Sequence, residues 1–227
     1  MSIRKSRSGF TLLELMLALA LGILASTMVV VTFAVVVKSW RTGTRLVDDL
    51  HHGDFVMDQL VSGLRSAYYP DASGKIIEYG FWLEDQGSGE FAKDSISWVK
   101  LGASLAEEAS AVVAGPHRTR FSIEDDADRE PGAAVRFWRP YSQPDDFDPS
   151  EIPPQFLSSR VTGFDCRVAT NMVDGEWEWE DVWEEESTNH LPRAVELTLF
   201  LRPLDEGGEH LEMRRYVELP VAHLSWK

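Results

Sequence analysis

Cysteine is almost absent from this chain of 227 residues, in which Cys166 is the single one. A single cysteine can form neither an intramolecular disulfide nor a thiolate metal site, so the chain folds without covalent cross-links. Basic residues are also scarce: 22 Lys and Arg face 37 Asp and Glu, for a formal net charge of −15. Because phosphate binding needs clustered lysines and arginines, and none cluster here, the composition argues against a nucleic-acid partner.

The signatures of common catalytic and cofactor sites are also missing. The sequence contains no G-x-G-x-x-G, no P-loop and no G-x-S-x-G elbow, and its six histidines form neither H-x-x-x-H nor H-E-x-x-H. We therefore expect no enzymatic activity, no cofactor and no metal site. Paired carboxylates are so frequent in this acidic chain that a glycosidase pair stays open on sequence grounds.

Two acid-rich stretches invite comparison with calcium loops. An EF-hand loop starting at Asp126 would need Gly at its sixth position and Glu at its twelfth, where this chain has Pro131 and Phe137. We interpret the acids as solvated loop residues, while another kind of oxygen-ligand site stays open. They are Asp125, Asp126, Asp128 and Glu130 in one stretch, and Asp145, Asp146 and Asp148 in the other.

What the sequence does have is a long hydrophobic run. From Phe10 to Val37 it contains no Lys, Arg, Asp, Pro or His, and a single acid, Glu14. As a helix the run would be about 42 Å long, more than the ~30 Å of a bilayer core. It exceeds the apolar core of a cleaved signal peptide, about 7–15 residues, and its one A-x-A site, Ala18-Leu19-Ala20, lies inside the run. The run predicts a membrane-spanning helix.

Glu14 does not fit a generic membrane anchor. A carboxylate inside the apolar band costs about 2.5–3.5 kcal/mol on insertion scales and normally has a partner. The segment itself offers no partner, so the acid either reaches the headgroups near the basic leader or pairs with another chain. The leader contains Arg4, Lys5 and Arg7.

The stretch Ser8-Gly9-Phe10-Thr11-Leu12-Leu13-Glu14-Leu15 resembles the processing site of type IV prepilins. In that family a membrane peptidase cleaves after the glycine on the cytoplasmic side and methylates the new N-terminal amine. The resemblance implies that the cut falls between Gly9 and Phe10, that Phe10 becomes N-methylated, and that Glu14 faces the amine of a neighbouring subunit during assembly. Opposite charges attract strongly in a low dielectric, and either one alone is penalised.

The orientation of the run rests on this motif. Three basic residues precede the run, and three follow it, so the positive-inside rule does not decide. Those that follow are Lys38, Arg41 and Arg45. The processing motif requires the leader inside, which puts the rest of the chain outside the inner membrane. We expect residues 1–9 to be the leader, 10–37 the transmembrane segment and 38–227 a periplasmic globular domain.

The pattern beyond the run predicts an α+β domain. Apolar residues continue a helical period until Tyr68-Tyr69-Pro70, so one helix is expected from Phe10 to Ala67, membrane-spanning and then amphipathic, packed on an antiparallel sheet. Surface loops are expected at Asp125–Gly132 and Tyr141–Pro154. The expected strands are Lys75–Trp82, Ser95–Lys100, Arg118–Ile123, Ala134–Trp138, Gly163–Ala169, Trp177–Trp183, Ala194–Leu201 and Leu211–Leu219.

The stretch from Gly163 to Leu199 narrows the resemblance. Gly-Phe-Asp-Cys-Arg-Val, Asp-Gly-Glu-Trp-Glu-Trp and His-Leu-Pro-Arg-Ala-Val-Glu-Leu-Thr-Leu follow one another there, in an order similar to the minor pseudopilin J family of type II secretion. That resemblance implies a pilin-like fold and, as partners, I-like and K-like minor pseudopilins, the major pseudopilin, the prepilin peptidase and the inner-membrane assembly platform. Minor pilins of type IV pili share the anchor and are the alternative.

Three tryptophans, Trp177, Trp179 and Trp183, are spaced so that they share one face of a strand. We interpret this face mainly as core packed against the long helix. The alternative is an aromatic platform for a sugar or a partner protein, as in a membrane-anchored carbohydrate-binding module. With the tryptophans packed in the core, the intervening acids would face solvent. They are Glu176, Glu178, Glu180 and Glu184.

Overall fold

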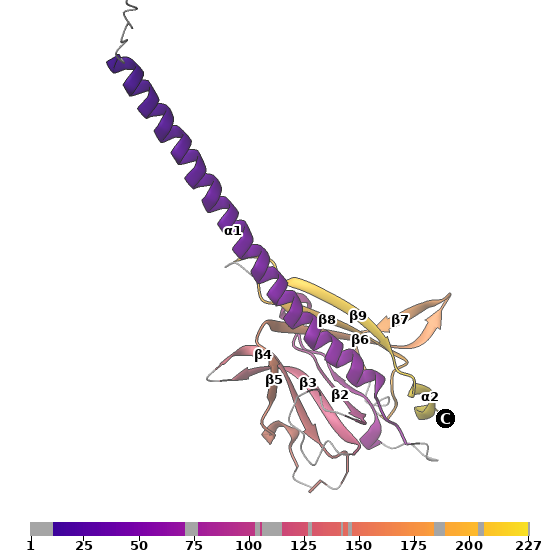
Figure 1. The fold of residues 1–227 in the computed structure, drawn as a ribbon. Helices are drawn as coiled ribbons and strands as arrows, with labels where there is room; N and C mark the ends of the chain where they lie inside the picture. The colour runs from indigo at the N-terminus through magenta and orange to yellow at the C-terminus, as the bar shows by residue number, and fades with distance from the viewer. Residues whose placement is uncertain are drawn as a thin grey trace, which may run out of the picture. The chain divides into compact units, whose positions relative to one another are not determined.

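The computed structural model describes residues 11–70, 77–102, 105, 115–126, 129–141, 143–144, 147–183, 189–203 and 207–226. The fold is α+β with one long N-terminal helix, as the sequence predicts, and the described strands form two antiparallel sheets where a single sheet was expected (Figure 1). The chain divides into two compact units, Met1–Val47 and Asp48–Lys227, and the helix contributes to both.

Helix α1 spans Leu12–Arg65, close to the expected Phe10–Ala67, although Phe10 lies outside the described residues. The helix ends two residues earlier than expected because the next residues pair with a strand. Ala67 forms an isolated antiparallel bridge with Lys100, and the Tyr68 amide donates to the Val99 carbonyl at 2.8 Å. Sheet pairing therefore ends the helix before Pro70 does.

The first sheet has five strands in the order β1-β2-β3-β4-β5, and neighbouring strands pair antiparallel. They are β1 (Trp82–Glu84), β2 (Ser95–Lys100), β3 (His117–Asp126), β4 (Arg129–Trp138) and β5 (Gln155–Ser158). Three short 3-10 helices lie between strands along the chain or before the first. These are η1 (Ile77–Tyr79), η2 (Gly89–Phe91) and η3 (Pro149–Glu151).

The second sheet has four strands in the order β7-β6-β8-β9, and its neighbours also pair antiparallel. They are β6 (Val161–Val173), β7 (Glu176–Glu180), β8 (Ala194–Leu201) and β9 (Leu211–Glu218). A one-turn helix, α2 (Ala222–Ser225), follows the last strand.

A three-residue segment, 92–94, joins the two sheets. It leads directly into β2 of the first sheet, and it also pairs with the edge of β6 through a parallel bridge between Lys93 and Phe164. The Phe164 amide donates to the Ala92 carbonyl at 2.8 Å, and the Asp94 side chain accepts from the Cys166 amide at 2.8 Å. Asp94 is 1% exposed, and this burial raises the pKa of its carboxyl to about 6.

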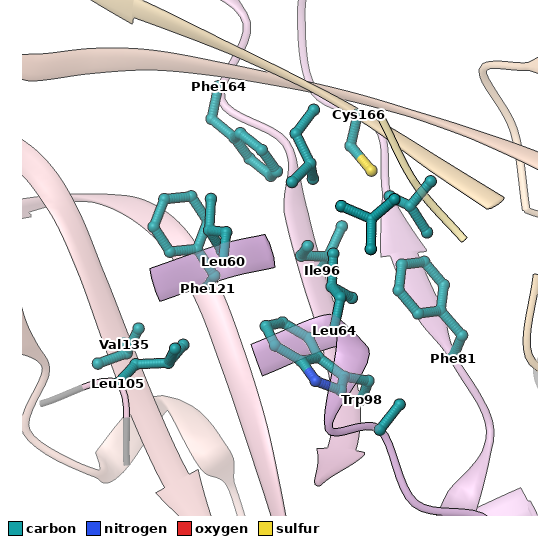
Figure 2. Packing of buried hydrophobic residues seen from close by; sticks show 14 of the residues in the cluster. Leu60, Leu64, Phe81, Ile96, Trp98, Leu105, Phe121, Val135, Phe164 and Cys166 are labelled. Carbon is teal, nitrogen blue, oxygen red and sulfur yellow. The ribbon is translucent and has the colours of Figure 1, made fainter. Parts of the chain in front are cut away.

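The core of the larger unit lies between the second part of α1 and the two sheets. The helix buries Val56, Met57, Leu60 and Leu64 completely. Figure 2 shows Leu60 and Leu64 among aromatic and aliphatic side chains of both sheets, which include Trp98, Ile96, Phe121, Phe164 and Phe81. The long helix thus packs on the sheets, as predicted.

Glycine gives α1 its close approach to the sheets. A Cβ at Gly53 would overlap the sulfur of Met213 on β9, and a Cβ at Gly63 would lie 3.0 Å from the Trp98 ring. Their packing supplies a reason for their presence.

Several expected elements need correction. The expected strand Lys75–Trp82 is wrong, because Ile77–Tyr79 is a 3-10 turn and the strand starts only at Trp82. The expected loop Asp125–Gly132 is also wrong, since β3 and β4 run into it from both sides. Strand β5 was not expected. In contrast, the bounds of β2 and β8 are confirmed to the residue.

Candidate functional site

The N-terminal end of α1 is closed by a reciprocal pair of hydrogen bonds. The Thr11 amide donates to Glu14 Oε2 at 2.9 Å, and the Glu14 amide donates to Thr11 Oγ1 at 3.3 Å. The Thr11 hydroxyl also donates to Glu14 Oε2 at 3.1 Å. This is a capping box, in which a threonine and a glutamate three residues later satisfy each other's free amides.

The capping box corrects one point of the sequence analysis. Glu14 has a hydrogen-bond partner in its own segment, although not a charged one. The signal was present in the sequence as T-x-x-E at the start of the apolar run. Gly9 and Phe10, the expected cleavage and methylation positions, lie outside the described residues. The assembly role of Glu14 stays a prediction.

The first part of α1 presents apolar side chains on all sides. Between Leu12 and Val36 the large apolar side chains are 57% to 77% exposed. In the part of the chain that the structure describes, α1 is the one helix long and apolar enough to cross a membrane. Side chains of this kind require an apolar surrounding, and the helix offers the length that a bilayer needs.

The three tryptophans do not share one face, contrary to the sequence prediction. Strand β7 ends at Glu180, and Trp183 beyond it is only 6% exposed, with its ring edge-to-face on Phe81 at 6.2 Å. Trp183 is therefore core. Trp177 and Trp179 stay on β7, half-buried, with their ring centroids 6.5 Å apart.

Trp179 meets a residue from the opposite edge of its sheet. Its ring centroid lies 6.4 Å from that of Tyr216 on β9, and strands β6 and β8 run between the two. The register places Ala169 and Ala194 in the row beside Trp179, and both alanines are completely buried. Two small side chains thus leave room for the large rings to meet above them. Sequence analysis did not identify Tyr216, because nothing local relates it to Trp179.

Most charged side chains near Trp179 and Tyr216 form ion pairs. Arg167 contacts Asp181 at 2.8 Å and Glu196 at 3.4 Å, and Arg214 contacts Glu212 at 2.7 Å. On the other face of β7, three glutamates are exposed, as expected. They are Glu176, Glu178 and Glu180; Glu184 lies outside the described residues.

The described residues of the acid-rich stretches do not gather into a metal site. Among the residues that the structure describes, no three His, Cys, Asp or Glu side chains are placed to hold an ion. Asp125 pairs with Lys93 at 3.0 Å, Glu130 pairs with Arg202, and Asp148 accepts from the Ser150 amide at 2.8 Å. The positions of Asp128, Asp145 and Asp146 lie outside the described residues.

Comparison with known families adds one match. Residues 4–30 match the family model described as the prokaryotic N-terminal methylation motif, which is type IV prepilin-like. The matched stretch contains the basic leader, the Gly9–Phe10 step, the Thr11–Glu14 capping box and the first turns of α1. Comparison with curated proteins finds no match. The motif, the apolar helix and the α+β fold together support a membrane-anchored protein of the pilin and pseudopilin class.

Proposed function

We propose that this chain is a minor pseudopilin of the J type, a structural subunit that helps to start a short fibre used in protein export by type II secretion. The observation that carries the proposal is that one helix, α1, contains both the end of the methylation motif and the turns that pack in the core. The methylation motif at residues 4–30 runs without a break into α1, and the later turns of the same helix form one side of the core. Anchor and display domain are thus one folded chain.

The proposed mechanism is electrostatic and steric. The prepilin peptidase cuts after Gly9 and leaves a positive amine on Phe10, which it methylates. In the free subunit Glu14 caps its own helix through Thr11. In the fibre the carboxylate takes the amine of a neighbouring subunit as a charged partner, which a low dielectric favours. The anchor helices then pack side by side, while the sheets present surfaces to other subunits.

The second sheet supports the J assignment. The three motifs that resemble this family fall on β6, on β7 and on the stretch that leads into β8, so they build adjoining strands of one sheet. Under this proposal the domain lies in the periplasm, and the partners are I-like and K-like minor pseudopilins, the major pseudopilin and the assembly platform of the inner membrane.

Mass spectrometry of the mature protein tests the proposal directly. The expected N-terminus is N-methyl-phenylalanine at position 10. A chain that still begins at Met1, or that begins well after the apolar run, contradicts it. A type IV pilus role is separated by complementation: the gene should restore secretion in a strain that lacks its minor pseudopilin. Restoration of pili without restoration of secretion would favour the minor-pilin alternative.

A further inference from the structure

Strand β7 lies at the edge of the second sheet. The sheet order places it at one end, and within the described residues no hydrogen bond joins its outer side to another segment. A tight turn at Asp174 and Gly175 connects it to β6, and both residues have positive φ, of 53° and 88°. These values are typical of a type I′ hairpin, which fixes the register of β7 on β6. Figure 1 shows this hairpin extending from the second sheet.

The two faces of β7 differ sharply in chemistry. The sequence Glu-Trp-Glu-Trp-Glu places both tryptophans on one face and three exposed glutamates on the other. The aromatic face continues onto exposed neighbours: Met172, paired with Trp177, is 53% exposed, and Tyr216 is 61% exposed. An added strand would therefore find apolar contacts on one side and negative charge on the other.

The glutamates select against a second copy of this chain. Natural sheets protect free edges with charged side chains. If β7 paired antiparallel with another β7 so that the tryptophan faces joined, Glu178 would lie opposite Glu178, and Glu176 opposite Glu180. Like charges directly opposite each other are destabilising. A register shifted by one residue would place tryptophan opposite glutamate and divide the aromatic face.

We propose that the outer edge of β7 binds an extended segment of another protein in which basic and apolar residues alternate. The segment adds a strand to the second sheet through main-chain hydrogen bonds. Its basic side chains lie opposite the three glutamates, and its apolar side chains extend the surface of Trp177 and Trp179. The net charge of −15 attracts such a segment. This inference is independent of the fibre role.

The test uses the full-length chain in micelles of an uncharged detergent and a labelled peptide of about seven residues, the length of an ordinary strand, in which lysine alternates with valine and tyrosine. Two further peptides carry N-methyl groups on alternate amides, one set on each edge. We expect binding, protection of β7 amides from hydrogen exchange, and tolerance of methylation on one edge only. A strand that pairs through one edge requires this asymmetry.

Protein variants complete the test. Replacing Glu176, Glu178 and Glu180 together by glutamine should weaken binding about tenfold, as the loss of three cross-strand charge pairs predicts. The matched control changes three exposed acids elsewhere, so the net negative charge decreases by the same amount, and it should bind nearly like the original chain because the glutamates of β7 are unchanged. These control changes are Asp48→Asn, Glu151→Gln and Glu209→Gln.

Three results would overturn the proposal. The first is equal binding of both N-methylated peptides, or of a peptide with its lysines in one block, which would mean unspecific attraction. The second is self-association that the Glu178→Gln change strengthens in place of peptide binding, which would identify a second copy as the occupant. The third is binding of a glycan, seen by quenching of tryptophan fluorescence, without binding of the peptide. None of these depends on processing at Gly9, so failure here and failure of the fibre proposal are distinguishable.

Discussion

Trp98 of β2 donates its indole N–H to the carbonyl oxygen of Gly63, in the last turns of α1, at 3.0 Å. The bond is buried, and the same ring lies where a side chain at position 63 would begin. One glycine thus provides both the acceptor and the space for the largest completely buried side chain. Helix and sheet are held at a fixed separation by this pair.

The first prediction concerns that separation. Gly63→Ala should lower the free energy of unfolding by about 1–3 kcal/mol, because the new methyl group would lie 3.0 Å from Trp98 and 3.1 Å from Leu105. Gly43→Ala is the control, since nothing lies within 4 Å of its Cβ and alanine favours helix. Urea unfolding of the full chain in micelles, followed by tryptophan fluorescence, measures both. Equal stability of the two variants would contradict the packing argument.

The second prediction concerns processing. Gly9→Ala should leave the leader attached. The peptidase of the proposed class cleaves after a small residue, and the methyl group of alanine makes the residue at the cut larger than glycine. Immunoblots of cells with and without the peptidase report the size of the chain. A normal mature band in the variant would remove Gly9 from the cleavage site.

The third prediction separates the two partners of Glu14. Glu14→Gln keeps the capping geometry but removes the charge, whereas Thr11→Val removes the side-chain cap but keeps the charge. If pairing with a neighbouring amine drives assembly, the glutamine variant should be processed normally and should lose co-purification with other subunits from solubilised membranes. The valine variant should retain it. The reverse pattern would show that Glu14 acts only as a cap.

The fourth prediction concerns pH. Because burial raises the pKa of Asp94 to about 6 from an ordinary value of 3.8, the folded state disfavours its charged form. Its contribution to stability is therefore complete below pH ~4 and is lost as the pH rises to about 6, by roughly 3 kcal/mol in total.

The Asp94→Asn variant isolates this effect. It cannot titrate, so the difference in unfolding free energy between the original chain and the variant should fall between pH 4 and pH 6, whatever other groups do. Urea unfolding at several pH values gives that difference. If the two curves ran parallel across this range, the buried carboxyl would not be the cause.

The fifth prediction contrasts two tryptophans six residues apart. Trp183→Ala should cost about 3–5 kcal/mol of stability, because it empties a buried site against Phe81. Trp177→Ala should cost much less, since that side chain is half-buried at the sheet edge. The same unfolding assay decides, and similar losses would mean that Trp177 also belongs to the core.

Sequence reasoning succeeded where a long periodic signal was available. The apolar run and its amphipathic continuation predicted α1, and the strand pattern predicted β2 and β8 with the bounds that the structure has. It failed for β1 and β5, which have three and four residues and are therefore too short for a period to show.

The candidate site shows the same division. The prepilin-like motif is local, so it could be recognised, and the T-x-x-E capping box was equally available to a closer inspection of Thr11 and Glu14. The contact of Trp179 with Tyr216 depends on the strand order and on two buried alanines between them. The local sequence pattern predicts neither the strand order nor the burial of these alanines, because packing of the whole domain sets the strand order.

The segment at residues 92–94 has a consequence for how this domain responds to force or heat. Because Ala92 and Asp94 are hydrogen-bonded to β6 and the segment continues covalently into β2, separation of the two sheets requires these hydrogen bonds to break. A force applied to one sheet is therefore transmitted to the other. In the fibre proposed above, this linkage would oppose partial opening, which would expose unpaired strand edges to neighbouring subunits.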